Sequence, residues 1–325
     1  MASPAKFGVF VPQGWKMDLV EIQDPVEKFE AMTAVGKLAD DSNFDSIWVY
    51  DHFHTVPTPE IETTFECWTI TATLARDTKR VKIGQMVGCN GYRNPALYAK
   101  IASTVDVASH GRLYAGIGAG WYEHEWKAYG YEWNDIPVRM AKFREAIEII
   151  NKMWHETKPV YAGKHYQIDG PINEPKGAGG TPPKLWIGGG GEQVTLKLVA
   201  KYADACNIGG GNPEVCAQKI EVLKRHCDTL GRDFDAIVKS TSADPLILLE
   251  KESDADEATK TLRGSATVAE YLAKSPWVGT QEQISERLEK VFATGINYII
   301  CKMPRVAYEH DQLTNFSNKI IPQFS

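Results

Sequence analysis

The sequence of 325 residues lacks the features that mark several large classes of protein. Its six cysteines lie far apart and include no CxxC pair, so neither a disulfide framework nor a zinc ribbon is indicated. No apolar run approaches the roughly 18 residues of a membrane span. The chain also does not begin with a cationic segment and a long apolar core, as a secretory signal would. We therefore expect a cytoplasmic protein with reduced cysteines and no membrane partner.

The charge of the chain has no basic excess. Lys and Arg together number 36 against 42 Asp and Glu, which gives a net charge of −6, and the charges are spread along the sequence. Nothing here favours nucleic acid or an acidic membrane as a partner. With 43% hydrophobic residues the chain has the ordinary composition of a soluble globular enzyme with a large core, and its length suits one large barrel or two smaller domains.

Short apolar runs alternate with helical patterns along the whole chain. We predict strands over residues 6–11, 46–50, 81–87, 113–117, 184–187, 205–208, within 238–249, and 298–301. A helix is expected after each, with starting signals such as Asn94 before Pro95 and a capping box of Thr280 with Gln283. Helix five is expected to begin at residue 192. Eight strands alternating with eight helices favour a closed α/β barrel of the (β/α)8 TIM type, whose chemistry sits at the carboxyl ends of the strands. A doubly wound open sheet is the alternative.

We expect a single barrel domain over residues 1–325 with two insertions. The first, near residues 158–183, is rich in Gly and Pro and too long for a simple turn. The second, near residues 250–278, is charged and then mixed in composition.

Asp51 and His52 lie where the second strand should end. In a barrel this position reaches the active site, where His52 would hydrogen-bond a ring or relay a proton and Asp51 would orient it. A histidine satisfied within its loop is the alternative. His52 and His54 also form an HxH pair of the kind that binds metals. Because strands five to eight supply no His, and only Cys206 and Asp244 are near, we expect no metal.

Glycines follow several of the predicted strands. The run 188–191 before a helix suits a phosphate, as does the second run at 209–211, although a tight turn would explain either. The segment GIGAG at 116–120 lacks the GxGxxG spacing of a Rossmann fingerprint, and it more readily lets a planar cofactor approach the backbone. The aromatic residues after it, Trp121, Tyr122 and Trp126, would line a substrate pocket or merely cover the barrel mouth.

Four segments together resemble the bacterial luciferase-like flavin and deazaflavin oxidoreductases. They are DHF at 51–53, YRNPALYAK at 92–100, HGRLYAGIGAGWYEHEW at 110–126, and PPKLWIGGGGEQVTLKLVAKYAD at 182–204. The likeness continues to the closing GTQEQISERLEKVFATGINYIIC at 279–301. Within the superfamily, GAGWYEHE and HCDTLGRD look most similar to the actinobacterial branch that uses the deazaflavin coenzyme F420.

The resemblance implies a barrel that holds the flat ring at the strand ends and the phosphate near the glycines at 188–191. It implies a nonprolyl cis peptide at Met86-Val87, and Asp51 and His52 as the catalytic pair facing the reactive ring edge. It also implies a homodimer through helices two and three. The cofactor-binding residues implied are Asp51, Met86, Val87, Gly118, Gly120, Trp121, Gly188, Gly189, Gly190, Gly191, Asn207 and Gly209.

These features together predict an F420-dependent oxidoreductase. It would transfer a hydride between reduced deazaflavin and a small, uncharged, conjugated organic substrate, with a separate enzyme reducing the cofactor. Family members that oxidise glucose 6-phosphate have a Glu and a Lys where this chain has Trp121 and Asn212, which argues against that substrate. The alternatives are an FMN-dependent two-component monooxygenase, a noncatalytic flavin-binding protein, and a zinc hydrolase.

Overall fold

A computed structural model describes residues 4–324. Eight parallel strands form a closed barrel in which β3 pairs with both β2 and β5, so the sheet has no open end. This closure confirms the predicted (β/α)8 barrel and excludes the doubly wound open sheet. The barrel strands are β1 (Lys6–Phe10), β2 (Ser46–Val49), β3 (Lys82–Gln85), β5 (Leu113–Gly118), β8 (Lys184–Gly188), β9 (Ala205–Asn207), β10 (Val238–Ala243) and β13 (Tyr298–Cys301).

The third predicted strand is interrupted. After β3 the chain passes through a cis peptide bond between Met86 and Val87, as expected from the resemblance, and resumes as β4 (Gly88–Cys89) beside β5.

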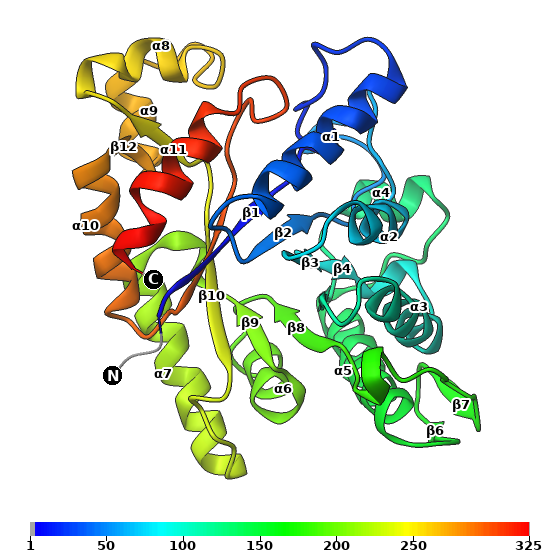
Figure 1. Ribbon diagram of the computed structural model, residues 1–325. Coiled ribbons are helices and arrows are strands. Elements are labelled where there is room, and N and C mark those ends of the chain that lie inside the picture. Colours follow the sequence, from blue (N-terminus) through cyan, green and yellow to red (C-terminus); the bar gives the residue numbers. More distant parts are fainter. Residues whose placement is uncertain (1–3, 325) are drawn as a thin grey trace.

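Eight helices surround the barrel in the predicted alternation (Figure 1). They are α1 (Pro25–Asp40), α2 (Cys67–Asp77), α3 (Pro95–Ala108), α5 (Ile136–His155), α6 (Thr195–Tyr202), α7 (Pro213–Leu230), α10 (Gln281–Phe292) and α11 (Asp311–Lys319). Asn94 caps α3 and Thr280 forms the capping box of α10, as predicted. The start predicted for α6 at residue 192 is wrong, because residues 192–194 form a turn whose Glu192 pairs with Lys219 at 2.7 Å.

The interior of the barrel is filled by large side chains. Trp48, Trp186 and Tyr298 pack together inside it, whereas the larger apolar core lies between the strands and the helices. Gly8 and Gly84 make room for Trp48, since a Cβ atom at Gly84 would lie 2.3 Å from the indole. This plug leaves the carboxyl ends of the strands as the place where the barrel itself can hold a ligand.

The two segments predicted as insertions carry structure outside the barrel. The first forms an antiparallel hairpin of β6 (Val160–Ala162) and β7 (Gln167–Asp169). The second carries α8 (Ala255–Thr259) and α9 (Val268–Lys274) between β11 (Ile247–Leu249) and β12 (Val278–Thr280), and Figure 1 shows it far from the hairpin. No helix within residues 4–324 has the length and apolar character needed to span a bilayer.

Candidate active site

A cavity of about 380 Å³ opens at the carboxyl ends of the strands. Ten of the predicted site residues line it: Asp51, His52, Met86, Val87, Gly118, Gly120, Trp121, Gly188, Gly189 and Asn207. Three other predicted residues, Gly190, Gly191 and Gly209, are not among the lining residues. The volume lies within the range of pockets that hold small ligands. The barrel mouth is thus hollow where the sequence predicted a ring.

His52 is held by a buried carboxylate. Its Nδ1 atom lies 2.8 Å from Oε2 of Glu125, whose side chain has no exposed surface. The same carboxylate accepts hydrogen bonds from the Tyr92 hydroxyl at 2.8 Å and from the backbone N–H groups of Phe53 and His54. Burial alone would raise the pKa of Glu125, but these bonds hold it below its usual value. Because the ionised carboxylate only accepts, Nδ1 of His52 must carry the proton, and Nε2 is left for the cavity.

Asp51 does not orient His52, contrary to the expectation from the sequence. Its fully buried carboxylate accepts the Cys89 N–H at 2.7 Å and forms a two-pronged ion pair with Arg93 at 2.5 and 3.0 Å. Arg93 also binds Glu66 at 2.6 Å. Arg93 therefore draws the Asp51 side chain away from its neighbour in the chain. Asp51 ties the end of β2 to β4, and the orienting role belongs to Glu125.

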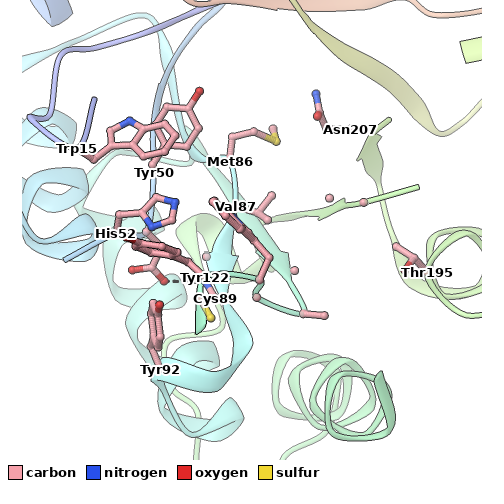
Figure 2. Close-up of a pocket in the computed structure, with 18 residues that line it drawn as sticks. Trp15, Tyr50, His52, Met86, Val87, Cys89, Tyr92, Tyr122, Thr195 and Asn207 are labelled. Atoms are coloured by element: carbon pink, nitrogen blue, oxygen red, sulfur yellow. Dashed lines mark hydrogen bonds between the residues drawn. The ribbon is translucent and has the colours of Figure 1, made fainter. Parts of the chain in front are cut away.

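Aromatic rings form one side of the cavity. Trp15 lies face to face with His52 at 4.6 Å between ring centroids and 10° between planes, and it contacts Tyr50 at 4.1 Å. Trp121 and Tyr122 meet His52 edge-on at 5.8 and 6.0 Å. Figure 2 shows Trp15, Tyr50 and His52 grouped together, across the pocket from Thr195 and Asn207. Trp126, one of the aromatic residues expected at the pocket, is instead buried against Tyr92.

Small residues form the wall beside Met86 and Val87. A Cβ atom at Gly118 would lie 2.6 Å from Val87, and one at Gly188 would lie 2.7 Å from it. Gly120 has a φ of +79°, and a Cβ there would lie 2.6 Å from Cys89 Sγ. Only glycine fits these three positions without movement of a neighbour. The resulting smooth wall, which lines the same cavity as the aromatic side, suits a flat group, so a deazaflavin or flavin ring fits the residues present.

Polar groups lie at the far end of the cavity. Gly188, Gly189, Thr195 and Asn207 line it there, and Asn207 Nδ2 donates to Ser240 Oγ at 3.1 Å. The cap residue of α6, Val194, supplies no side-chain hydrogen bond to the first turn of the helix. N–H groups at such a terminus favour an anion. This end of the cavity is therefore the part suited to a phosphate.

The structure does not support a metal centre at the HxH pair. His52 Nδ1 is occupied by Glu125, and His54 instead lies beside His124, with 3.0 Å between Nε2 and Nδ1. Within residues 4–324 no group of three or more His, Cys, Asp or Glu side chains is placed to hold a metal ion.

A model of the luciferase-like monooxygenase family matches residues 5–290. The chain belongs to this family. It is 26% identical over 317 residues to the F420-dependent glucose-6-phosphate dehydrogenase of Amycolatopsis mediterranei, a match that covers 88% of this chain and 91% of the relative. It is 27% identical over 238 residues to the phthiodiolone/phenolphthiodiolone dimycocerosates ketoreductase of Mycobacterium tuberculosis. This match covers 67% of this chain and 61% of the relative.

Two solved structures show that this family fold is shared by proteins bound to different cofactors. An F420-dependent secondary alcohol dehydrogenase in complex with an F420-acetone adduct has a TM-score of 0.79 at 20% identity, over 99% of both chains. The oxygenating constituent of 3,6-diketocamphane monooxygenase from Pseudomonas putida, in complex with FMN, has a TM-score of 0.76 at 16% identity, again over 99% of both chains. At this identity the likeness establishes the fold of the chain alone.

Several residues of the site were missed from the sequence. Glu125 lies in the segment EHE and Trp15 follows the first strand in QGW, but neither has a local pattern that points to His52. The cavity is lined by Trp15, Tyr50, Cys89, Tyr92 and Thr195, whereas Glu125 contacts its lining residue His52. The one available signal was position, because Tyr50 ends a predicted strand and the others, apart from Thr195 in the predicted helix from residue 192, lie in loops after predicted strands.

Proposed function

We propose that this luciferase-like protein is an F420-dependent oxidoreductase that transfers a hydride between reduced deazaflavin and a small organic substrate. The observation that carries the proposal is the cavity lined both by the glycine wall at Val87 and by the ring of His52. The names of the glucose-6-phosphate dehydrogenase and ketoreductase relatives support F420 over FMN and a reduction or dehydrogenation over oxygen insertion.

When bound, the reduced deazaflavin supplies the hydride from its C5 atom. His52 places Nε2 in the cavity while Glu125 holds Nδ1. A histidine fixed in this way accepts a proton at Nε2 and returns it, so it would deliver the proton that a reduced substrate needs. Trp15 stacked on the imidazole restricts its rotation and shields it from water.

The other site residues position the cofactor in this proposal. Met86, Val87, Gly118 and Gly120 would support the ring, and Asp51 would fix the β4 segment beside it. The N–H groups at residues 188–191, with Thr195 and Asn207, would hold the phosphate. Gly209, in the turn after Asn207, would help to position that residue.

The reacting part of the substrate is expected to be uncharged and conjugated. Trp121, which is 61% exposed, stands at the cavity mouth at the position where glucose-6-phosphate oxidising members have the acid. Its aromatic surface favours a flat, electron-poor group over a sugar.

The deciding experiment compares cofactor binding to the purified protein by quenching of tryptophan fluorescence. We expect F420 to bind at least about tenfold more tightly than FMN, a difference of roughly 1.4 kcal/mol. Reduced F420 should then be oxidised by an enone substrate without oxygen. Tighter binding of FMN together with oxygen-dependent turnover would instead establish the two-component monooxygenase.

We also expect a particular oligomeric state, a cellular location and a source of reduced cofactor for this enzyme. A homodimer through α2 and α3 is supported by exposed Leu97 and Val107 on α3, and light scattering of the wild type and of Leu97→Glu would test it. A cytoplasmic location fits the six cysteines, which are all free and buried. A separate reductase would supply the reduced cofactor.

A further inference from the structure

A second cavity, of about 470 Å³, lies beside the first at the ends of β1, β10 and β13. Tyr50 lines both cavities, and Trp15 of the first is followed in the chain by Lys16 of the second. Tyr50 stacks on Phe10 at 4.2 Å and contacts Trp15 at 4.1 Å. Aromatic rings therefore separate the two cavities. A ligand long enough to extend beside these rings would occupy both cavities.

The walls of the second cavity include apolar side chains with large exposed surfaces. Met17 is 39% exposed and Leu262, from the segment before α9, is 37% exposed. Val20, Met303 and Val306 continue this lining. Exposed apolar side chains gathered around a cavity indicate a ligand with an apolar body.

Two ammonium groups converge on one of the rings that separate the two cavities. The Nζ atoms of Lys16 and Lys302 lie 4.6 and 5.5 Å from the centroid of the Trp15 ring. Burial, and after it the charge of Lys302, lower the pKa of Lys16. The Lys16 ammonium makes no ion pair or hydrogen bond within residues 4–324, and the charges of Asp244 and Asp18 act on it from a longer distance. Lys302, 18% exposed, has Asp244 at 3.5 Å as its partner.

The other charged groups of the cavity make few direct contacts with these two lysines. Arg305 is satisfied by Glu21 at 2.6 Å and Glu309 at 2.9 Å. The Asp18 carboxylate accepts the Gly14 N–H at 2.6 Å and lies beyond ion-pair distance of either lysine, although its charge acts on both. Asp244 is thus the one carboxylate among residues 4–324 that lies within ion-pair distance of either lysine. An incoming anion would form charge-assisted hydrogen bonds to both.

We propose that the second cavity binds the far end of the substrate: an apolar body against Met17 and Leu262, ending in a carboxylate between Lys16 and Lys302. The inference rests on the proposed function, which places the reacting group in the first cavity. It refines the expected substrate, because only the reacting group remains uncharged, while the opposite end carries a negative charge.

The test compares octanoate with 1-octanol as ligands of the full-length protein by titration calorimetry, without cofactor. We expect octanoate to bind at least about tenfold more tightly, as a charge-assisted contact with two lysines would give. The double variant Lys16→Met/Lys302→Met keeps the apolar stems and should lose this preference. Lys290→Met is the matched control, since Lys290 lines a separate groove, and should keep it.

A third variant locates the site. Leu262→Trp should weaken the binding of both ligands, because the larger ring would fill the cavity. Equal affinity of the two ligands in the wild type, a preference that persists in the double lysine variant, or no effect of Leu262→Trp would each overturn the proposal. Retained 1-octanol binding in the lysine variants shows that they are folded. Since no cofactor or turnover enters, this result is independent of the F420 binding test.

Discussion

The Nδ1 atom of His52 lies 2.8 Å from Oε2 of Glu125, although the two residues are 73 positions apart in the chain. His52 follows β2 and Glu125 lies in α4 (Glu123–Ala128), which follows β5. Closure of the barrel brings these two loops together at its mouth. Through this pair, Glu125 fixes the orientation of the His52 ring beside the cavity.

Replacement of His52 by Ala should lower kcat with reduced F420 by about 100-fold or more, the usual loss when a positioned acid–base group is removed. Cofactor affinity should change less than about threefold, because the glycine wall and the phosphate end remain. Stopped-flow oxidation of the reduced cofactor and fluorescence quenching measure the two quantities separately. Unchanged turnover would remove His52 from the mechanism.

Glu125→Gln should destabilise the protein by about 2–3 kcal/mol near neutral pH, since a charged acceptor of four hydrogen bonds is lost. The pKa of Glu125 in the folded protein lies below its ordinary value of 4.5. The contribution of ionised Glu125 to the free energy of unfolding is therefore complete above pH 4.5. It is lost as the pH falls through the lowered pKa. Urea unfolding of both proteins at several pH values should show the difference shrinking in acid. A difference that grows in acid would contradict the assignment.

Buried Arg93 supports a separate prediction. Arg93→Met would leave the fully buried Asp51 carboxylate without its cation, so we expect a loss of about 3–5 kcal/mol in the free energy of unfolding. Lys184→Met removes an exposed ion pair with Asp204 and is the control, with an expected loss of about 0–1 kcal/mol. Equal losses in urea titrations of the two variants would show that Asp51 is stabilised by other groups.

Much of the fold was predictable because its signals are local. Buried parallel strands appear in the sequence as apolar runs. Asn94 and Thr280 are capping residues that mark the starts of their helices. The partner of His52 was not predictable in this way. Asp51 was the nearest carboxylate in sequence, but Arg93 engages it, and Glu125 reaches His52 only through the closed barrel. Trp15 was missed for the same reason, since its contact with His52 joins the loops after β1 and β2.

The glycine wall gives the last prediction. Gly118→Ala places a Cβ atom where it would lie 2.6 Å from Val87 Cγ2, so Val87 or β5 must move. Overpacking of this kind should cost about 1–3 kcal/mol of stability and, if the wall supports the cofactor ring, weaken F420 binding by about tenfold.

Its matched control is the double variant Gly118→Ala/Val87→Ala. Removal of the Val87 methyl groups makes space for the new Cβ atom, so the double variant should regain part of the stability and affinity. The expected coupling between the two sites is about 0.5–3 kcal/mol in urea unfolding. Strict additivity would mean that the alanine is accommodated without pushing Val87. Regained stability without regained affinity would mean that the alanine itself, and not the displacement of Val87, blocks the cofactor.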